Sequence, residues 1–145
     1  MRLSRKFSGS PRGWTDALLT GIKEIDEQHK VMFDVIAQLE QAVSAEDKWS
    51  AVHFALVELT SYVNIHFAVE EALLRLHDYP ELNAHIASHR AFSAALADIK
   101  KHSIREDVSD AMTTLVKTWL AQHIGKEDIA YVPHLRNAPL ARSAG

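Results

Sequence analysis

The sequence predicts an all-α protein, an up-down-up-down antiparallel four-helix bundle with a di-metal site in its core, and three observations support this prediction. Four stretches repeat apolar residues at alternating steps of three and four, as helices do when they bury one face. Glycine and proline, five and four of 145 residues, mostly stand between these stretches or near the chain ends. The chain also holds nine histidines, and five of them occupy positions within the apolar repeat.

The periodic stretches are flanked by segments of different composition. Residues 1–13 are rich in Ser, Gly, Pro and basic residues, and we expect a flexible lead-in there. We expect residues 14–135 to form one domain, which suits the chain length, and residues 136–145 to form a loose tail. Strand-like alternation, internal repeats and low-complexity tracts do not occur in the sequence.

Each stretch defines one expected helix and its buried positions. The first comprises Ile22, Ile25, His29, Met32, Ile36, Leu39 and Val43. The second comprises Val52, Leu56, Leu59, Val63, His66, Glu70 and Leu73. The third comprises Leu82, His85, His89, Phe92, Leu96 and Ile99. The fourth comprises Val108, Met112, Leu115, Trp119 and His123.

Helix-start signals separate these stretches. Asp47, the Tyr79-Pro80 step and Asp107 mark the expected starts of the second, third and fourth helices. The connections between helices are only a few residues long, and short connections make neighbouring helices antiparallel. The up-down-up-down topology follows.

Ionisable side chains stand in all four stretches where leucine or isoleucine is expected. They are His29, His66, Glu70, His85, His89 and His123. Burying one unpaired ionisable group costs several kcal/mol. A lone histidine in such a position is usually a hydrogen-bonded core residue, but five histidines and a glutamate on four helices share one explanation, a metal centre between the helices.

Spacing along the helices favours such a centre. His66 and Glu70 are four residues apart, as are His85 and His89, so each pair projects from one helical face about 6 Å apart. His29 adds a ligand from the first helix.

The fourth helix needs an irregularity to contribute two ligands. His123 and Asp128 are five residues apart and would diverge by roughly 140° on an ideal helix. They converge only if the helix loosens between them, and Gly125 is where it can. Otherwise Asp128 is a solvated charge beside Lys126 and Glu127.

The donor set indicates two metal ions with one free coordination position. Five imidazoles supply five nitrogens, two bridging carboxylates supply four oxygen bonds, and a bridging hydroxide or oxide supplies two more. Two six-coordinate ions need one bond more than this total, and a vacant position is typical of binding or catalytic centres. Imidazole and carboxylate without sulfur suit iron, with manganese, zinc or cobalt as alternatives.

The nitrogen-rich composition also favours reversible dioxygen binding over oxidative chemistry. Carboxylate-rich di-iron bundles carry Glu-x-x-His units, and no Glu in this sequence is followed three residues later by His. Neutral imidazoles in place of carboxylates stabilise the reduced ions against high-valent states.

The whole ligand pattern resembles the hemerythrin family in its bacterial form. The matching positions are Trp14, Leu18, Gly21-Ile22, Ile25-Asp26, Gln28-His29, His66-Phe67, Glu70-Glu71, His85, His89, Trp119-Leu120, His123-Ile124 and Asp128. They span residues 14–131 in the family's order. The resemblance implies two iron ions and dioxygen as the ligand. One ion would take His85, His89 and His123, the other would take His29 and His66 and stay open, and Glu70 and Asp128 would bridge.

Several neighbouring residues have candidate roles beside the ligands. Phe67, Trp119, Leu120 and Ile124 flank ligand positions and are candidates to wall a dry dioxygen pocket, although each also suits plain core packing. Tyr131 matches a tyrosine that the family places near the centre. Gln28 and Glu71 are candidates to orient ligand imidazoles or are surface residues. We expect the remaining histidines at the surface: His53, His77, His102 and His134.

Composition excludes several classes of function. A net charge of −3 gives no attraction to nucleic acid or an anionic membrane. The absence of cysteine excludes disulfides and thiolate sites. Without an apolar segment after the N-terminal basic residues, or a membrane-length apolar run, we expect a cytoplasmic protein. An oxygen carrier or store is favoured over an enzyme. A sensor or delivery module with an oxidase or redox partner, and a peroxide or nitric oxide reductase, remain the alternatives.

Overall fold

All regular secondary structure in the described part of the chain is helical. The computed structural model describes residues 14–43, 48–103 and 107–137. The expected lead-in (1–13), the expected helix start at Asp47 and residues 138–145 of the expected tail lie outside the described residues. The elements are η1 (Asp16–Leu18), α1 (Lys23–Val43), α2 (Lys48–Leu76), α3 (Leu82–His102), α4 (Ser109–Gln122), η2 (His123–Asp128) and α5 (Ile129–Asn137).

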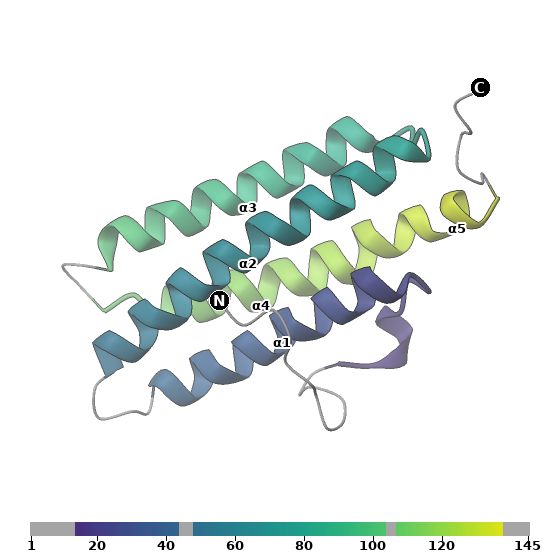
Figure 1. Cartoon of the computed structure of the whole chain (residues 1–145). Helices are drawn as coiled ribbons and strands as arrows, with labels where there is room; N and C mark the ends of the chain where they lie inside the picture. Colours follow the sequence, from purple (N-terminus) through teal and green to yellow (C-terminus); the bar gives the residue numbers. More distant parts are fainter. Residues whose placement is uncertain (1–13, 44–47, 104–106, 138–145) are drawn as a thin grey trace.

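Four helical rods form the predicted bundle (Figure 1). η2 is a π-helical turn that continues α4 into α5 without a break, so these three elements make the fourth rod. α1 packs against α2 and α4, and α3 packs against the same two helices. Consecutive rods run in opposite directions, which confirms the up-down-up-down antiparallel topology.

The largest part of the apolar core fills one half of the bundle, and the other half buries a group of polar side chains among fewer apolar ones. The largest part is formed by the last turns of α1, the first turns of α2, the last turns of α3 and the first turns of α4. Buried at its centre are Leu39, Leu56, Leu59, Leu96 and Met112. Because the rods are antiparallel, the opposite half joins the start of α1, the end of α2, the start of α3 and the end of the fourth rod.

Several details of the predicted apolar faces are wrong. Ile22, Leu82 and Ile99 are half-buried. Leu74 is fully buried at the end of α2, whereas Leu73 is only half-buried. On α4 the buried positions are Val116 and Leu120, and the predicted Leu115 and Trp119 are half-buried. Steps of three and four rotate a helix in opposite senses, so where both steps reach an apolar residue the neighbouring helices decide which one faces inward.

A tight turn brings the end of α2 beside the start of α3. The backbone N–H of Tyr79 donates to the carbonyl of Leu74 at 3.0 Å, and that of Asp78 donates to the carbonyl of Arg75 at 3.2 Å. Asp78 adopts a left-handed φ of 51°, which aspartate tolerates better than most residues. Pro80 then prevents the helix from continuing.

A second turn fixes the start of α1. The carboxylate of Asp26 accepts hydrogen bonds from the backbone N–H of Thr20 at 2.8 Å and of Gly21 at 3.1 Å, and the Thr20 hydroxyl donates to it at 2.8 Å. Gly21 has a φ of 84°, a region that favours glycine. The carboxylate thus ties the entering chain to the first turn of α1, close to His29.

Among the residues that the structure describes, one helix is long and apolar enough to cross a membrane by length and composition. It is α2, over Trp49–Leu76, and 44% of its most apolar window is buried inside the bundle. Core helices of bundles pass the same test, because they bury one face against their neighbours.

Candidate metal centre

Seven polar side chains converge in the half of the bundle opposite the apolar core. They are the residues predicted as ligands, and each is at most 4% exposed: His29, His66, Glu70, His85, His89, His123 and Asp128. Their ligand atoms fall into two overlapping groups, each within 4.8 Å. The first contains His85, His89 and His123, the second contains His29 and His66, and Glu70 and Asp128 belong to both.

The Glu70 carboxylate divides its oxygens between the two groups of histidines. Its Oε1 lies 3.0 Å from Nε2 of His89 and also contacts Nε2 of His85. Its Oε2 lies 3.5 Å from Nε2 of His66. Each oxygen therefore faces a different set of imidazoles.

Asp128 repeats this arrangement from the fourth rod. Its Oδ1 lies 3.0 Å from Nε2 of both His85 and His123. Its Oδ2 lies 3.0 Å from Nε2 of His29. Two carboxylates that each offer one oxygen to either group have the donor geometry required to bridge two metal ions.

The irregularity expected on the fourth helix is a π-helical turn. η2 spans His123 to Asp128 and contains Gly125. A π turn joins residues five apart instead of four, so it brings the two end residues onto one side of the rod. A Cβ at Gly125 would meet Leu18 at an ordinary 3.9 Å, so the glycine is not required for lack of space.

Unsatisfied polar atoms inside the cluster fit a metal. Both ring nitrogens of His29, Nε2 of His66 and both oxygens of Asp128 are buried without a hydrogen-bond partner. Buried polar atoms in native proteins are almost always paired, and a bound ion is one explanation for a group of exceptions. Apart from Nδ1 of His29, these atoms are the predicted metal donors, so the residues present fit the implied ions.

Polar side chains hold three of the imidazoles by their outer nitrogens. Nδ1 of His66 lies 2.6 Å from Oε1 of Gln28, and Nδ1 of His89 lies 2.8 Å from Oε2 of Glu71. Such a partner fixes the ring tautomer and turns Nε2 towards a metal. Gln28 and Glu71 therefore contact ligand imidazoles, which agrees with an orienting role and not with a plain surface position.

His123 has an outer partner that sequence reasoning missed. Its Nδ1 lies 2.9 Å from Oε2 of Glu127 and 3.3 Å from Oγ of Ser88. In the sequence Glu127 stands out only as a charged neighbour of Asp128. Its position four residues after His123 is the one signal that indicates the contact.

Tyr131 also reaches the cluster. It is fully buried, and its hydroxyl donates a hydrogen bond of 3.2 Å to Oε2 of Glu70. Burial raises its pKa far above the usual value, and the nearby carboxylates of Glu70 and Asp128 raise it further. The hydroxyl therefore remains a donor and orients the Glu70 carboxylate.

The electrostatics of the cluster favour protonated imidazoles when no metal is present. Burial by itself lowers the pKa of His123, but the adjacent carboxylates of Asp128 and Glu70 outweigh burial and raise the pKa to about 10. The same balance raises the pKa values of His29 and His85 to about 9. A metal would therefore displace protons from these three rings.

His66 and the two carboxylates titrate in the opposite direction. Burial lowers the pKa of His66 to about 3, so this ring is neutral at pH 7. Burial would raise the pKa values of Glu70 and Asp128, but the close contacts with the surrounding histidines lower both below their usual values. Both carboxylates are therefore ionised at neutral pH, as bridging ligands must be.

The four residues predicted to wall a dioxygen pocket lie in different surroundings. Phe67 stacks on the ring of His89 with centroids 3.8 Å apart, and Trp119 stacks on His123 at 4.2 Å. Ile124 is fully buried beside His123. Leu120 is buried and lines a cavity instead.

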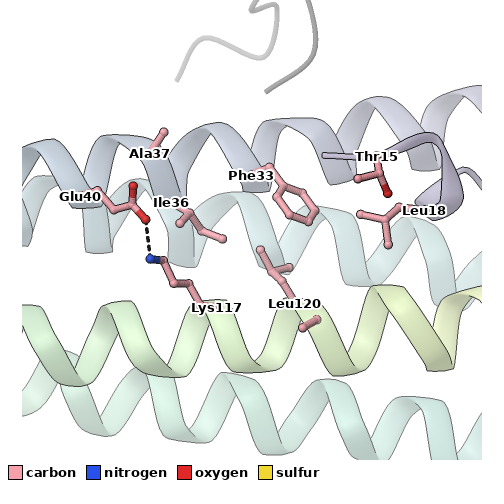
Figure 2. Close-up of a pocket in the computed structure, with 9 residues that line it drawn as sticks. Thr15, Leu18, Phe33, Ile36, Ala37, Glu40, Lys117 and Leu120 are labelled. Atoms are coloured by element: carbon pink, nitrogen blue, oxygen red, sulfur yellow. Dashed lines mark ion pairs between the residues drawn. The ribbon is translucent and has the colours of Figure 1, made fainter. Parts of the chain in front are cut away.

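That cavity lies between α1 and α4 and has a volume of about 580 Å³ (Figure 2). Leu18, Phe33, Ile36 and Leu120 give it apolar walls. The ion pair between Lys117 and Glu40 stands at one end, with Nζ 2.5 Å from Oε1.

The other four histidines are outside the cluster. His53 and His102 are exposed, as predicted. His77 and His134 are half-buried, and the prediction of plain surface positions is wrong for them. Nε2 of His134 donates to the backbone carbonyl of His77 at 2.8 Å, which joins α5 to the turn after α2.

Known proteins resemble this chain in sequence and in fold. The sequence model of the Hemerythrin family, described as the Hemerythrin HHE cation binding domain, matches residues 20–135. The bacteriohemerythrin of Pseudomonas aeruginosa (strain LESB58) is 33% identical over 126 residues, which cover 86% of this chain and 82% of that protein. The bacteriohemerythrin of Methylococcus capsulatus is also 33% identical, over 84% of this chain and 95% of its own.

A solved hemerythrin structure also has a fold similar to that of this chain. The crystal structure of wild-type hemerythrin superposes with a TM-score of 0.78 at 32% identity, covering 84% of this chain and 95% of that one. The chain therefore belongs to the hemerythrin family.

Proposed function

We propose that this protein binds dioxygen reversibly at a non-haem di-iron centre, for carriage, storage or delivery. One observation carries the proposal: Glu70 and Asp128 each offer one oxygen to a group of three histidines and the other to a group of two. Both curated relatives are named for the same class of protein.

The unequal histidine groups supply the binding position. We assign His85, His89 and His123 to one iron, and His29 and His66 to the other. Because the second group offers one nitrogen fewer, an iron held there would have a position free for dioxygen. When bound, the two iron ions supply the open site and the electrons that dioxygen takes up.

The surrounding residues hold the donors in place and keep water away. Gln28, Glu71 and Glu127 orient three imidazoles, and Tyr131 fixes the Glu70 carboxylate. A ring held at its outer nitrogen loses little freedom on binding metal, so the site is preorganised.

Apolar side chains cover the cluster. Phe67 and Trp119 lie flat on two imidazoles and, with Ile124, exclude water from the three-histidine side. Leu120, one turn before His123, stands at the cavity between α1 and α4. We propose that this cavity admits dioxygen, because its walls are mostly apolar and it borders the helix that carries His29.

Within this proposal the protein is an oxygen-binding protein and not an enzyme, and it works in the cytoplasm. Its partners are dioxygen itself and an oxidase or redox protein that receives dioxygen or restores the reduced state. Residues 14–135 form the working domain.

The test is an absorption spectrum of the protein reduced without air, then exposed to air and returned to argon. We expect a visible charge-transfer band that appears with air and disappears under argon over repeated cycles, with two irons per chain by elemental analysis. One metal per chain, or zinc alone after growth with ample iron, would contradict the di-iron centre. Irreversible oxidation on first exposure, with rapid consumption of added peroxide or nitric oxide, would replace the carrier by a reductase.

A further inference from the structure

One buried atom of the cluster is neither a predicted metal donor nor hydrogen-bonded to a described residue. It is Nδ1 of His29, and the side chain that carries it is fully buried. The outer nitrogens of His66, His89 and His123 each have a polar partner. Because such a partner fixes the ring and makes it a more basic ligand, His29 is the least supported of these four imidazoles.

The two groups of ligands therefore differ in support as well as in size. We call the group of His85, His89 and His123 the three-histidine position, and the group of His29 and His66 the two-histidine position. Both positions share the two carboxylates. A metal in the three-histidine position can form one more bond to nitrogen than a metal in the two-histidine position.

Carboxylates hold two rings of the three-histidine position, whereas an amide holds one ring of the two-histidine position. The carboxylates belong to Glu71 and Glu127, which lie 2.8 Å and 2.9 Å from the outer ring nitrogens. Their side chains are only 24% and 33% exposed, so water screens their charge only in part. The amide oxygen of Gln28 lies 2.6 Å from its ring. The added negative charge and ligand basicity favour a cation in the three-histidine position.

Ring stacking restricts the same two imidazoles further. The ring of Phe67 lies within 6° of parallel to that of His89, and Trp119 lies within 13° of parallel to His123. The two rings of the two-histidine position instead contact each other edge to face, with centroids 4.9 Å apart. A ring that is confined before metal arrives loses less conformational freedom on binding. Stacking thus also favours the three-histidine position.

We propose that the two positions bind metal in a fixed order, the three-histidine position first, and that dioxygen binding requires the second, more weakly held ion. This inference rests on the proposed di-iron function. In that function the free coordination position belongs to the iron of the two-histidine position, so a chain with one iron lacks it. The supply of available iron thereby regulates how much of the protein can bind dioxygen.

Graded removal of iron tests the order on the loaded protein. Reduced protein is equilibrated without air against increasing concentrations of nitrilotriacetate, and the iron that stays with the chain is measured by elemental analysis. We expect two separate losses with a plateau at one iron per chain. At least a tenfold range of chelator concentration should separate them, because one outer contact changes metal affinity about 10- to 100-fold. A single loss of both irons would overturn the proposal.

Gln28→Glu identifies the position that releases its iron first. The variant keeps an acceptor for the outer nitrogen of His66 and gives the two-histidine position the carboxylate partner that it lacks. The first loss should move to about tenfold higher chelator concentration, with the second loss unchanged. Gln41→Glu, exposed on the same helix, adds the same charge away from the cluster and should change neither loss. A shift of the second loss alone in Gln28→Glu would reverse the order.

Glu127→Ala tests the three-histidine position in the same way. It removes the closer outer partner of His123, so the second loss should move to about tenfold lower chelator concentration while the first loss stays in place. A substitution that only weakened the fold would move both losses together. Equal shifts of both losses in Gln28→Glu and in Glu127→Ala would show that the positions are equivalent and overturn the proposal.

Absorption spectra of the same samples separate this proposal from the proposed function. The reversible change with air should be absent at one iron per chain and should grow with the second iron. Half of the full change at one iron per chain would show that the irons bind in pairs, and it would overturn the fixed order. A plateau at one iron, with no reversible change at two, would keep the order and reject dioxygen binding.

Discussion

Nε2 of His123 lies 3.0 Å from Oδ1 of Asp128, although five residues separate the two along one uninterrupted rod. An α-helix would turn their side chains roughly 140° apart. The π turn η2 removes this divergence and delivers both donors to the same cluster. Because Asp128 also reaches His29 through its second oxygen, the turn links α1 to the fourth rod through the site.

In the proposed di-iron site, removing either bridging carboxylate should release both metals. Asp128→Ala and Glu70→Ala each take a donor from both ions, so we expect most bound iron to be lost, measured by elemental analysis of purified protein. His29→Ala removes a donor from one ion and should lose less. Asp110→Ala, an exposed acid on α4, is the control and should bind iron normally. Full iron content in Asp128→Ala would show that Asp128 is not a bridge.

The outer contact of Glu127 should tune metal affinity without supplying a ligand. Glu127→Ala frees Nδ1 of His123 from its closer partner, and loss of such a contact typically weakens metal binding about 10- to 100-fold. Competition with a chelator measures the affinity. Glu127→Gln should restore most of it, since an amide oxygen can still accept from the ring. Equal affinities for Glu127→Ala and wild type would reduce the contact to surface packing.

Shortening Leu120 should open the cluster side of the cavity to water. Leu120→Ala should cost about 2–5 kcal/mol of unfolding free energy and keep the fold. We expect near-normal iron content and faster irreversible oxidation of the iron in air, followed by loss of the reversible absorption change. Leu56→Ala removes an equally buried leucine from the opposite half of the bundle. That variant should lose similar stability with unchanged oxidation, so equal rates in the two variants would exclude a gating role for Leu120.

The metal-free protein should become less stable as the pH rises from 7 to 10. The pKa values of His29 and His85 are raised from 6.5 to about 9, and that of His123 to about 10. Their protonation stabilises the fold fully below pH 6.5, and this contribution disappears as the pH passes their folded-state values. Thermal melts of chelated protein at several pH values should show the fall in melting temperature.

On the acid side, two different effects reduce the stability of the metal-free protein. His66, with its pKa lowered to about 3, is protonated more readily in the unfolded chain, so stability declines as the pH falls from 6.5 towards 3. Glu70 and Asp128 have lowered pKa values, and their contribution is lost as the pH falls through those values. Iron-loaded protein should melt well above metal-free protein at pH 7, because the metal replaces the protons between the donors. Coincident melts would contradict a metal site in the core.

The sequence alone was sufficient to predict the four helical rods and most of the candidate ligands. Helical periodicity depends on neighbouring residues, so the four rods and the inward position of His29, His66, Glu70, His85 and His89 could be predicted without the structure. The count of nitrogen and oxygen donors predicted two metals, because it depends only on which residue types occupy these positions. The five-residue step from His123 to Asp128 even indicated where the last helix had to depart from regular geometry.

The packing of the helices against one another determined the remaining features, namely which α4 residues are buried and which side chains contact the ligands. These features depend on residues far apart in the sequence, so local patterns do not reveal them. Val116 and Leu120 face the core in place of Leu115 and Trp119 because α1 and α3 select one of two apolar lines on α4. The contact between Glu127 and His123 was not recognised, since a charge beside other charges is usually solvated. The assignment of each carboxylate oxygen of Glu70 to one histidine group is also tertiary, because it depends on four rods meeting within a few ångströms.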